Sequence, residues 1–102
     1  MAKYLLNSWS WNMARPKKVL VSKEEVTRDE FDRQKDDAIS CMGHPGLARV
    51  LNVPYNTEYI KLNVGDEALV VSTENGKLPY NALELPAGLS LKFDHVKILQ
   101  GL

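Results

Sequence analysis

The chain has 102 residues, of which 44% are hydrophobic and 25% are charged, as in an ordinary soluble globular domain. Its 13 Lys and Arg residues balance its 13 Asp and Glu residues, which excludes a nonspecific coat protein of DNA or RNA, since such a protein needs a basic excess. We therefore expect one small domain, residues 1–102, with no binding of duplex DNA and with any anionic ligand held at a local positive site.

The cysteine content and the hydropathy indicate a cytoplasmic protein. A single cysteine, Cys41, excludes a disulfide within the chain and suggests a reducing compartment. No apolar run approaches the roughly 20 residues of a membrane span, and the first residues lack the apolar core of a signal peptide. We expect no contact with a membrane.

Residues 3–6 form a short apolar strand candidate, and the segment that follows is the first candidate binding region. Asn7, Ser10 and Asn12 alternate there with two tryptophans, Trp9 and Trp11. Amide and hydroxyl groups beside flat indole rings suit a nucleobase and a phosphate. A loop that carries two core tryptophans explains the same residues equally well.

The next segments predict a strand and a surface helix. A basic turn at residues 15–18 precedes an apolar run at 19–22, which indicates a strand. Thr27 and Glu30 have the spacing of a capping box, so a helix should begin near Thr27. Its apolar anchors are Val26 and Phe31, and its acidic side chains fit no metal-binding motif. We expect a solvated helix and no metal.

A histidine in a glycine-rich turn is the second candidate. Residues 37–42 are predicted to be a strand, and Pro45 suits the first turn of a helix that ends near Asn52. This arrangement places His44 at a helix N-terminus, where free N–H groups favour an anion and where an imidazole can protonate a leaving oxygen. A turn with a surface histidine remains the commoner explanation of a Gly-His pair.

The last third of the chain completes an α/β fold. Residues 59–62, 68–71 and 96–99 are predicted strands, and the continuous apolar run at 68–71 indicates a central one. Asn75-Gly76 marks a turn before a loop that carries Lys77, and residues 82–93 alternate as in extended chain. We expect a mixed sheet of about five strands flanked by short helices, with the ligand site where loops converge at strand ends.

Three stretches together resemble the small ring-nuclease family of archaeal viruses and phages, a type III anti-CRISPR family. The first is residues 4–13, a strand followed by Asn, Ser and Asn at fixed spacing. The second is residues 38–44, which match the hydrophobic–Ser–x–hydrophobic–Gly-His signature before a helix. The third is residues 64–71, a Gly-Asp pair that leads into an apolar strand. The likeness spans roughly residues 3–79 in the same order.

The resemblance implies a homodimer that holds a cyclic oligoadenylate, typically cyclic tetra-adenylate, between its subunits and cuts it without a metal or a cofactor. A ribose 2′-hydroxyl attacks the neighbouring phosphate in such proteins, and a histidine protonates the departing oxygen. Carried over by position, His44 is that general acid. Asn7, Ser10 and Asn12 contact phosphate and ribose, and Gly43 permits close approach of the backbone. The protein would act in the cytoplasm of an infected host cell.

One loop departs from the family pattern. Residues 77–81 read Lys-Leu-Pro-Tyr-Asn where the family has Arg-Leu-Pro-Glu-Gly. Lys77 remains a candidate for ligand binding, but an ammonium group is a point charge that cannot grip phosphate in a bidentate fork. This change keeps a second hypothesis open, a sponge that sequesters a nucleotide signal unchanged. A third, a protein–protein inhibitor, rests on the exposed aromatic residues and the acidic helix.

Overall fold

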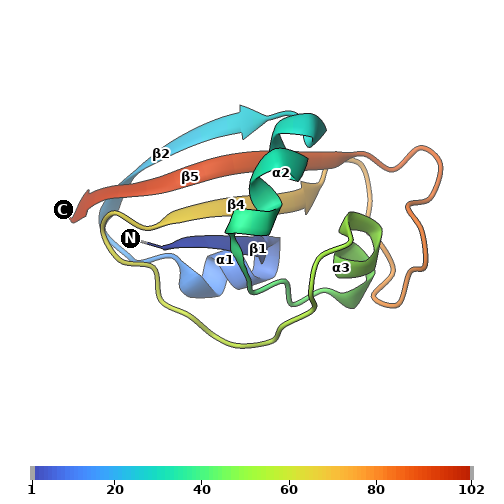
Figure 1. Cartoon of the computed structure of the whole chain (residues 1–102), viewed down its shortest axis with the longest axis horizontal. Coiled ribbons are helices and arrows are strands. Elements are labelled where there is room, and N and C mark those ends of the chain that lie inside the picture. The colour runs from blue at the N-terminus through green and yellow to red at the C-terminus, as the bar shows by residue number, and fades with distance from the viewer. Residues whose placement is uncertain (1, 102) are drawn as a thin grey trace.

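The protein folds around one mixed β-sheet, shown in Figure 1 as a computed structural model that describes residues 2–101. The sheet has five strands in the spatial order β2-β5-β4-β1-β3. Their bounds are β1 (Lys3–Asn7), β2 (Val19–Val26), β3 (Ile39–Ser40), β4 (Glu67–Thr73) and β5 (Leu91–Gly101). β1 runs parallel to β3 and β4, whereas β5 runs antiparallel to β4 and β2. The predicted α/β fold with a mixed five-stranded sheet is confirmed.

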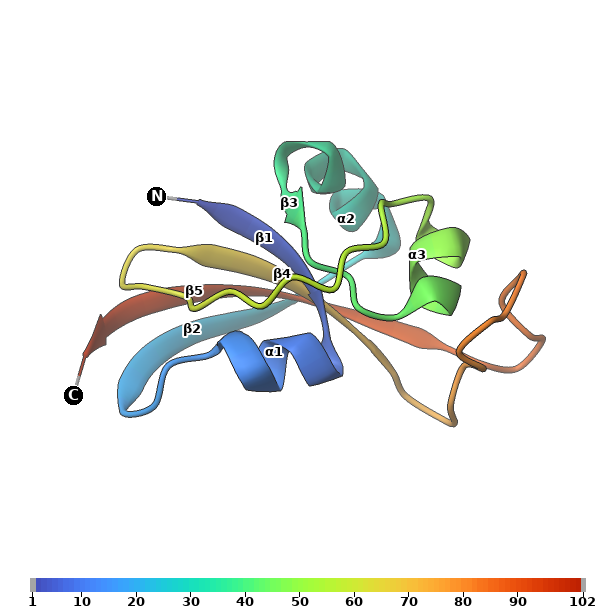
Figure 2. The ribbon, with the colours of Figure 1, turned by 90° about the horizontal axis from the view of Figure 1, so that it is seen from below.

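Short helices cover both faces of this sheet (Figure 2). The helix α1 (Ser8–Ala14) lies on one face. The helix α2 (Arg28–Gln34), the 3-10 turn η1 (Lys35–Asp37) and the helix α3 (Pro45–Leu51) lie on the other. Each α-helix has only seven residues, which is too short for an isolated helix in water. Their stability therefore comes from the side chains that they pack onto the sheet.

Alternation of side chains along the central strands divides the core in two. Leu5 in β1 belongs to the cluster beneath α2 and α3, and Leu6 belongs to the cluster beneath α1. In β4, Leu69 and Val71 face the first cluster, whereas Ala68 and Val70 face the second. β4 is the third of the five strands, so the prediction that the apolar run at 68–71 forms a central strand is confirmed.

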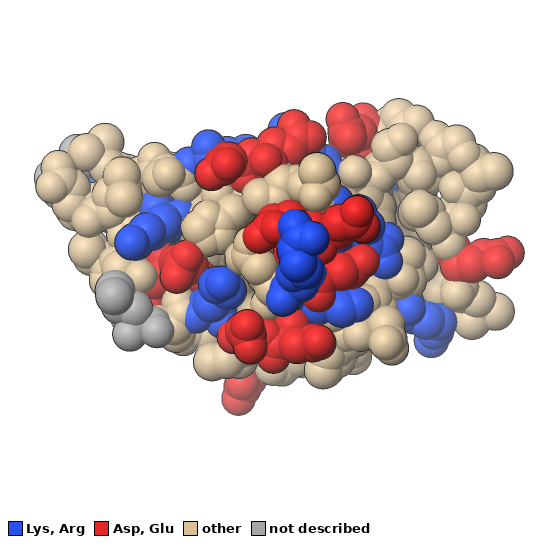
Figure 3. All heavy atoms as spheres, turned by 45° about the horizontal axis from the view of Figure 1, so that its top comes forward, with Lys and Arg blue, Asp and Glu red and all other residues tan. Residues whose placement is uncertain are grey.

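The charged helix α2 forms as its capping signal predicts. The Thr27 side chain accepts a hydrogen bond from the Glu30 backbone N–H at 3.1 Å. Phe31 is the buried residue of the helix, and the outer surface carries ion pairs such as Arg28–Asp32 at 3.3 Å. Figure 3 shows acidic and basic side chains intermixed on this side of the molecule. Exposed pairs of this kind contribute little to stability, so α2 is held mainly by Phe31.

The predicted strand at 59–62 is wrong. Residues 56–63 contain no helix or strand. Leu62 is buried in the core beneath α1, and Tyr59 is exposed. The alternation of apolar and polar residues therefore does reflect an extended chain that buries one of its sides. The Leu62 N–H donates to the Ala14 carbonyl at the end of α1, 3.0 Å away, rather than to a strand. A burial pattern fixes which side chains are inside, but it does not supply a neighbouring strand.

Other strands differ in length from their predictions. The strand expected at 37–42 is only Ile39–Ser40, because the chain turns toward α3 directly afterwards. The strands expected at 19–22 and 96–99 extend to Val19–Val26 and Leu91–Gly101, where they pair with each other along almost their whole length. No helix in residues 2–101 is long and apolar enough to cross a membrane.

Candidate functional site

Asn7 is the point at which β1 becomes α1. The segment 7–13, for which the sequence left a loop open, is helical from Ser8 onward. Ser10 Oγ accepts the Asn7 backbone N–H at 2.9 Å and donates to Asn7 Oδ1 at 2.5 Å. These reciprocal bonds satisfy polar groups at the start of the helix. Because Asn7 is also buried, its side chain is held in one orientation.

The same amide connects α1 to the glycine turn. Asn7 Oδ1 accepts the Gly43 backbone N–H at 3.2 Å, so Asn7, Ser10 and Gly43 form one hydrogen-bonded unit, as the sequence prediction groups them. Within residues 2–101, the Nδ2 group of Asn7 donates to no protein acceptor while Oδ1 is fully used. Its N–H donors therefore remain for a ligand.

His44 is fixed by hydrogen bonds to both ring nitrogens. It is the N-cap of α3, where Nδ1 accepts the Leu47 backbone N–H at 3.0 Å. A nitrogen that accepts carries no proton, so the ring hydrogen of neutral His44 is on Nε2. This Nε2–H donates to the Leu78 carbonyl at 3.1 Å. His44 therefore joins α3 to the loop after β4 while it caps the helix.

The loop at residues 77–82 covers the start of α3. The Gly46 N–H donates to the Tyr80 carbonyl at 2.9 Å, and Arg49 Nη1 donates to the Ala82 carbonyl at 2.7 Å. The sequence predicted free N–H groups here that would attract an anion. That expectation is wrong, because Pro45 has no N–H and those of Gly46 and Leu47 are bonded within the protein.

A hollow of about 240 Å³ brings several predicted site residues together. Asn7, His44 and Lys77 line it, from the end of β1, the start of α3 and the loop after β4. A neighbouring hollow of about 310 Å³ shares Asn7 and His44 and adds Gly43. A third, of about 220 Å³, is lined by Ser10 and again by Gly43. Five of the six predicted residues thus line three neighbouring hollows that share lining residues, and we call these three hollows together the groove.

Asn12 does not join this groove. It lines a separate hollow of about 200 Å³ between α1 and the sheet, together with Lys23 and Asp94. The reason is helical geometry, because each residue advances roughly 100° around the axis and Asn12 therefore lies roughly 200° from Ser10. The sequence spacing alone placed Asn12 with its neighbours, and the helix separates them.

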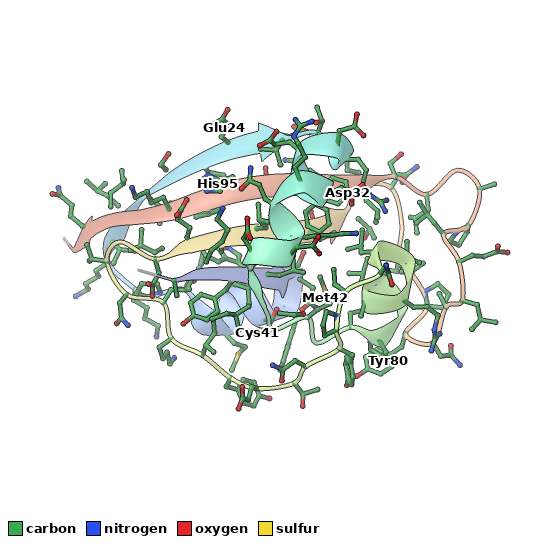
Figure 4. All side chains as sticks on the ribbon, viewed as in Figure 1. Glu24, Asp32, Cys41, Met42, Tyr80 and His95 are labelled. Atoms are coloured by element: carbon green, nitrogen blue, oxygen red, sulfur yellow. The ribbon has the colours of Figure 1, made fainter. Side chains whose placement is uncertain are left out.

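Aromatic residues border the groove, and of these the sequence analysis singled out Trp9 but not Tyr55, Tyr59 or Tyr80. The rings of Trp9 and Tyr59 have centroids 5.9 Å apart, and those of His44 and Tyr80 are 5.4 Å apart. The hydroxyls of Tyr80 and Tyr55 lie 3.2 Å apart, and this hydrogen bond raises the pKa of Tyr55. Tyr80 lies on the loop beside α3 (Figure 4). The sequence feature that could have predicted this aromatic cluster is the presence of two tyrosines, Tyr55 and Tyr59, in an otherwise polar segment.

The remaining titratable candidates have structural environments. Cys41 is buried in the core beneath α1. Burial raises the pKa of the Cys41 thiol, and the nearby Glu58 carboxylate raises it further. His95 Nε2 lies 2.7 Å from Glu67 Oε1 on the sheet, outside the groove. Within residues 2–101, no group of three or more His, Cys, Asp or Glu side chains could hold a metal ion.

Comparison with known proteins identifies a structural neighbour. No family model matches the chain, and no curated protein matches it. The chain is similar in structure to B116 of Sulfolobus turreted icosahedral virus (STIV), with a TM-score of 0.65 and 19% sequence identity over 95% of this chain and 99% of that chain. At this identity the similarity concerns the fold.

Proposed function

We propose that this protein binds a cyclic oligoadenylate, with cyclic tetra-adenylate as the first candidate, and cleaves it without a metal through His44. The observation that carries the proposal is the convergence of Asn7, Gly43, His44 and Lys77 on one groove from segments far apart in the sequence. The resemblance in motifs supports the same ligand. The fold shared with a viral protein fits a role against type III CRISPR immunity.

The groove offers the chemistry that a phosphodiester needs. The Asn7 amide can donate to phosphate oxygens, and the exposed Lys77 ammonium supplies a local positive charge in a protein of zero net charge. In the proposed step a ribose 2′-oxygen forms a bond to phosphorus and its proton passes to solvent. The bond from phosphorus to the 5′-oxygen breaks, and protonated His44 gives its Nε2 proton to that oxygen. The product is a linear oligonucleotide that ends in a 2′,3′-cyclic phosphate.

This step requires two changes at His44. Protonation places a hydrogen on Nδ1, so the ring must first give up the bond that Nδ1 accepts from the Leu47 N–H. Its Nε2–H is bonded to the Leu78 carbonyl, so the loop at residues 77–82 must move before the ring can reach a leaving oxygen. The same loop carries Lys77, which lines the groove. Ligand binding and release of His44 are therefore coupled in our proposal.

The hydrogen bonds of His44 favour one second candidate, a sponge that holds the ligand intact. If the loop stays in place, Nδ1 continues to accept from Leu47 and Nε2 continues to donate to Leu78. His44 would then only support the walls of the groove. The lysine at position 77, in place of a bidentate arginine, also lowers the capacity to stabilise a transition-state charge.

We also propose that two copies form the complete site. The two hollows that His44 lines have volumes of about 240 and 310 Å³, at the lower end of the roughly 300–1,000 Å³ usual for drug-sized ligands. A cyclic tetranucleotide is larger still, so it needs surface from a second subunit. Sedimentation equilibrium would give about twice the 11.5 kDa chain mass for a dimer, and a stable monomer in the presence of bound ligand would contradict this part of the proposal.

The decisive experiment incubates the protein with cyclic tetra-adenylate in excess EDTA and follows the products by mass spectrometry. Removal of a general acid should slow cleavage roughly 100- to 10,000-fold. We expect this loss in His44→Asn, because asparagine keeps an N-cap acceptor for α3 but has no proton to transfer at neutral pH. His95→Asn is the matched control, since His95 lies outside the groove.

Each result separates the candidates. If His44→Asn cleaves as fast as the unmodified protein, His44 is not the general acid. If the unmodified protein retains intact ligand through gel filtration, it is a sponge. If it neither binds nor cleaves cyclic tetra-adenylate or another cyclic oligoadenylate, the proposed function is wrong.

A further inference from the structure

Three exposed aromatic side chains line a second part of the groove. Trp9, Tyr59 and Tyr80 are 55%, 70% and 60% exposed, respectively, yet all three border the same hollow of about 220 Å³. We call this hollow the aromatic pocket. The remaining lining residues are Ser10, Cys41, Gly43, Asn56, Thr57 and Glu58. The aromatic pair of the core is a different one, the buried Phe31 and Phe93.

Hydrogen bonds hold the chain segments that carry these rings. Trp9 is in the first turn of α1, next to the capping bonds of Asn7. Tyr59 belongs to a segment fixed at both ends, where Asn56 N–H donates to the Met42 carbonyl and Leu62 N–H to the Ala14 carbonyl, each at 3.0 Å.

Tyr80 makes one hydrogen bond through its backbone and one through its side chain. Its carbonyl accepts the Gly46 N–H at 2.9 Å, and its hydroxyl is bonded to that of Tyr55 at 3.2 Å. Trp9 and Tyr59 lie outside the loop at 77–82 that moves in the proposed reaction, so the segments that carry these two rings lose little entropy when a ligand binds.

The aromatic pocket is continuous with the hollow that His44 and Asn7 line. Trp9, Gly43 and Tyr80 border both the aromatic pocket and the adjoining hollow of about 310 Å³, where Asn7 and His44 also lie. Flat aromatic faces therefore stand beside amide, imidazole and ammonium groups. A ligand that fits both parts has a planar ring joined to an anionic, hydrogen-bonding group.

From this juxtaposition we propose that the aromatic pocket is a nucleobase subsite, in which one base of the ligand stacks on Trp9 and Tyr59. The inference rests on the proposed function in that it places the phosphate of the same nucleotide beside Asn7 and His44. Stacking on aromatic side chains is sequence-tolerant, because every base has a flat π-face. The subsite thus supplies affinity, and the groups near His44 act on the backbone of the ligand.

The test compares AMP with ribose 5-phosphate, which has the same sugar and phosphate but no base. Trp11→Phe leaves Trp9 as the sole tryptophan, since the chain has two, so fluorescence then reports on this ring alone. We expect saturable quenching by AMP and none by ribose 5-phosphate. Equal responses to the two compounds, or no response to either, would overturn the subsite.

Substitutions then test which aromatic rings stack on the base. Trp9→Ala and Tyr59→Ala should each bind AMP and cyclic tetra-adenylate roughly 5- to 150-fold more weakly by calorimetry. Met13→Ala is the matched control, because Met13 is an exposed residue one turn further along α1 that does not line the aromatic pocket. Circular dichroism of each variant checks that the fold is retained.

The two proposals fail in distinguishable ways. If cyclic tetra-adenylate binds Trp9→Ala, Tyr59→Ala and Met13→Ala equally well, the subsite is wrong and the proposed function stands. If AMP binds at Trp9 but cyclic oligoadenylates are neither bound nor cut, the subsite stands and the proposed function fails. If Trp9→Ala turns a dimer into a monomer without changing AMP binding, a second copy covers the rings and the subsite is wrong.

Discussion

Gly46 is the residue at which a single methyl group would separate α3 from the loop that covers it. A Cβ atom added there would lie 2.6 Å from the Pro79 carbonyl oxygen and 3.2 Å from that of Tyr80. Both are backbone atoms, which cannot turn aside as a flexible side chain does. It would also lie 3.0 Å from Cε1 of His44. In Gly46→Ala the loop must therefore move away from the helix.

The cost follows from the bonds that this movement breaks. They are the bond from Gly46 N–H to the Tyr80 carbonyl and the bond from His44 Nε2–H to the Leu78 carbonyl. Each is worth about 0.5–1.5 kcal/mol net, and the better helix propensity of alanine returns up to about 1 kcal/mol. The two bonds together are worth about 1–3 kcal/mol, so after this return we expect a net loss of up to about 2 kcal/mol in the free energy of unfolding, with a midpoint of about 1 kcal/mol. In a domain of this size a loss of about 1 kcal/mol lowers Tm by roughly 4–8 °C.

Urea denaturation followed by circular dichroism measures this loss. Gly43→Ala is the control, because its added Cβ would meet only Asn7 Oδ1 at 3.7 Å, an ordinary contact. We expect this control to change stability by less than about 0.5 kcal/mol. A Gly46→Ala protein that is as stable as the unmodified one would refute the reasoning, since the loop would then not be held against α3.

Three further predictions concern the core, the cap of α3 and the thiol. Phe31→Ala should lower the free energy of unfolding by about 3–5 kcal/mol, because Phe31 is fully buried, and a loss below about 1 kcal/mol in thermal unfolding would contradict this. His44→Ala should cost about 1–3 kcal/mol in urea denaturation by loss of the cap and the loop bond, and His44→Asn should be less damaging; equal losses would argue against capping. Cys41 should react with iodoacetamide far more slowly in the folded protein than after unfolding, and Glu58→Gln should lower the pKa of the thiol because it removes a negative neighbour. Since the pKa of the folded thiol is raised, the unfolded chain loses this proton first as pH rises, so the Cys41 contribution to stability should fall above the ordinary thiol pKa; a rise there would contradict the assignment.

Local chemistry made several elements predictable from the sequence. Thr27 and Glu30 set the start of α2, and Pro45 sets the start of α3, because each acts through groups within one helical turn. The continuous apolar run at 68–71 indicated a central strand, and it forms one that is buried on both faces. The resemblance in motifs grouped Asn7, Ser10, Asn12, Gly43, His44 and Lys77, and all of them except Asn12 line neighbouring hollows.

Tertiary structure alone decided what those groups can do. The sequence shows His44 before a helix. Only the packing of the loop at 77–82 brings the Leu78 carbonyl to His44 Nε2 and the Tyr80 carbonyl to the Gly46 N–H at the start of α3. The helical path of α1 turns Asn12 away from Ser10, and a segment without a partner strand presents Tyr59 to Trp9. Burial patterns and helix caps depend on residues that are close together in the chain, so they can be predicted from the sequence. Contacts between residues far apart in the sequence, such as His44 and Leu78, depend on how the elements pack, so they are determined only in the folded chain.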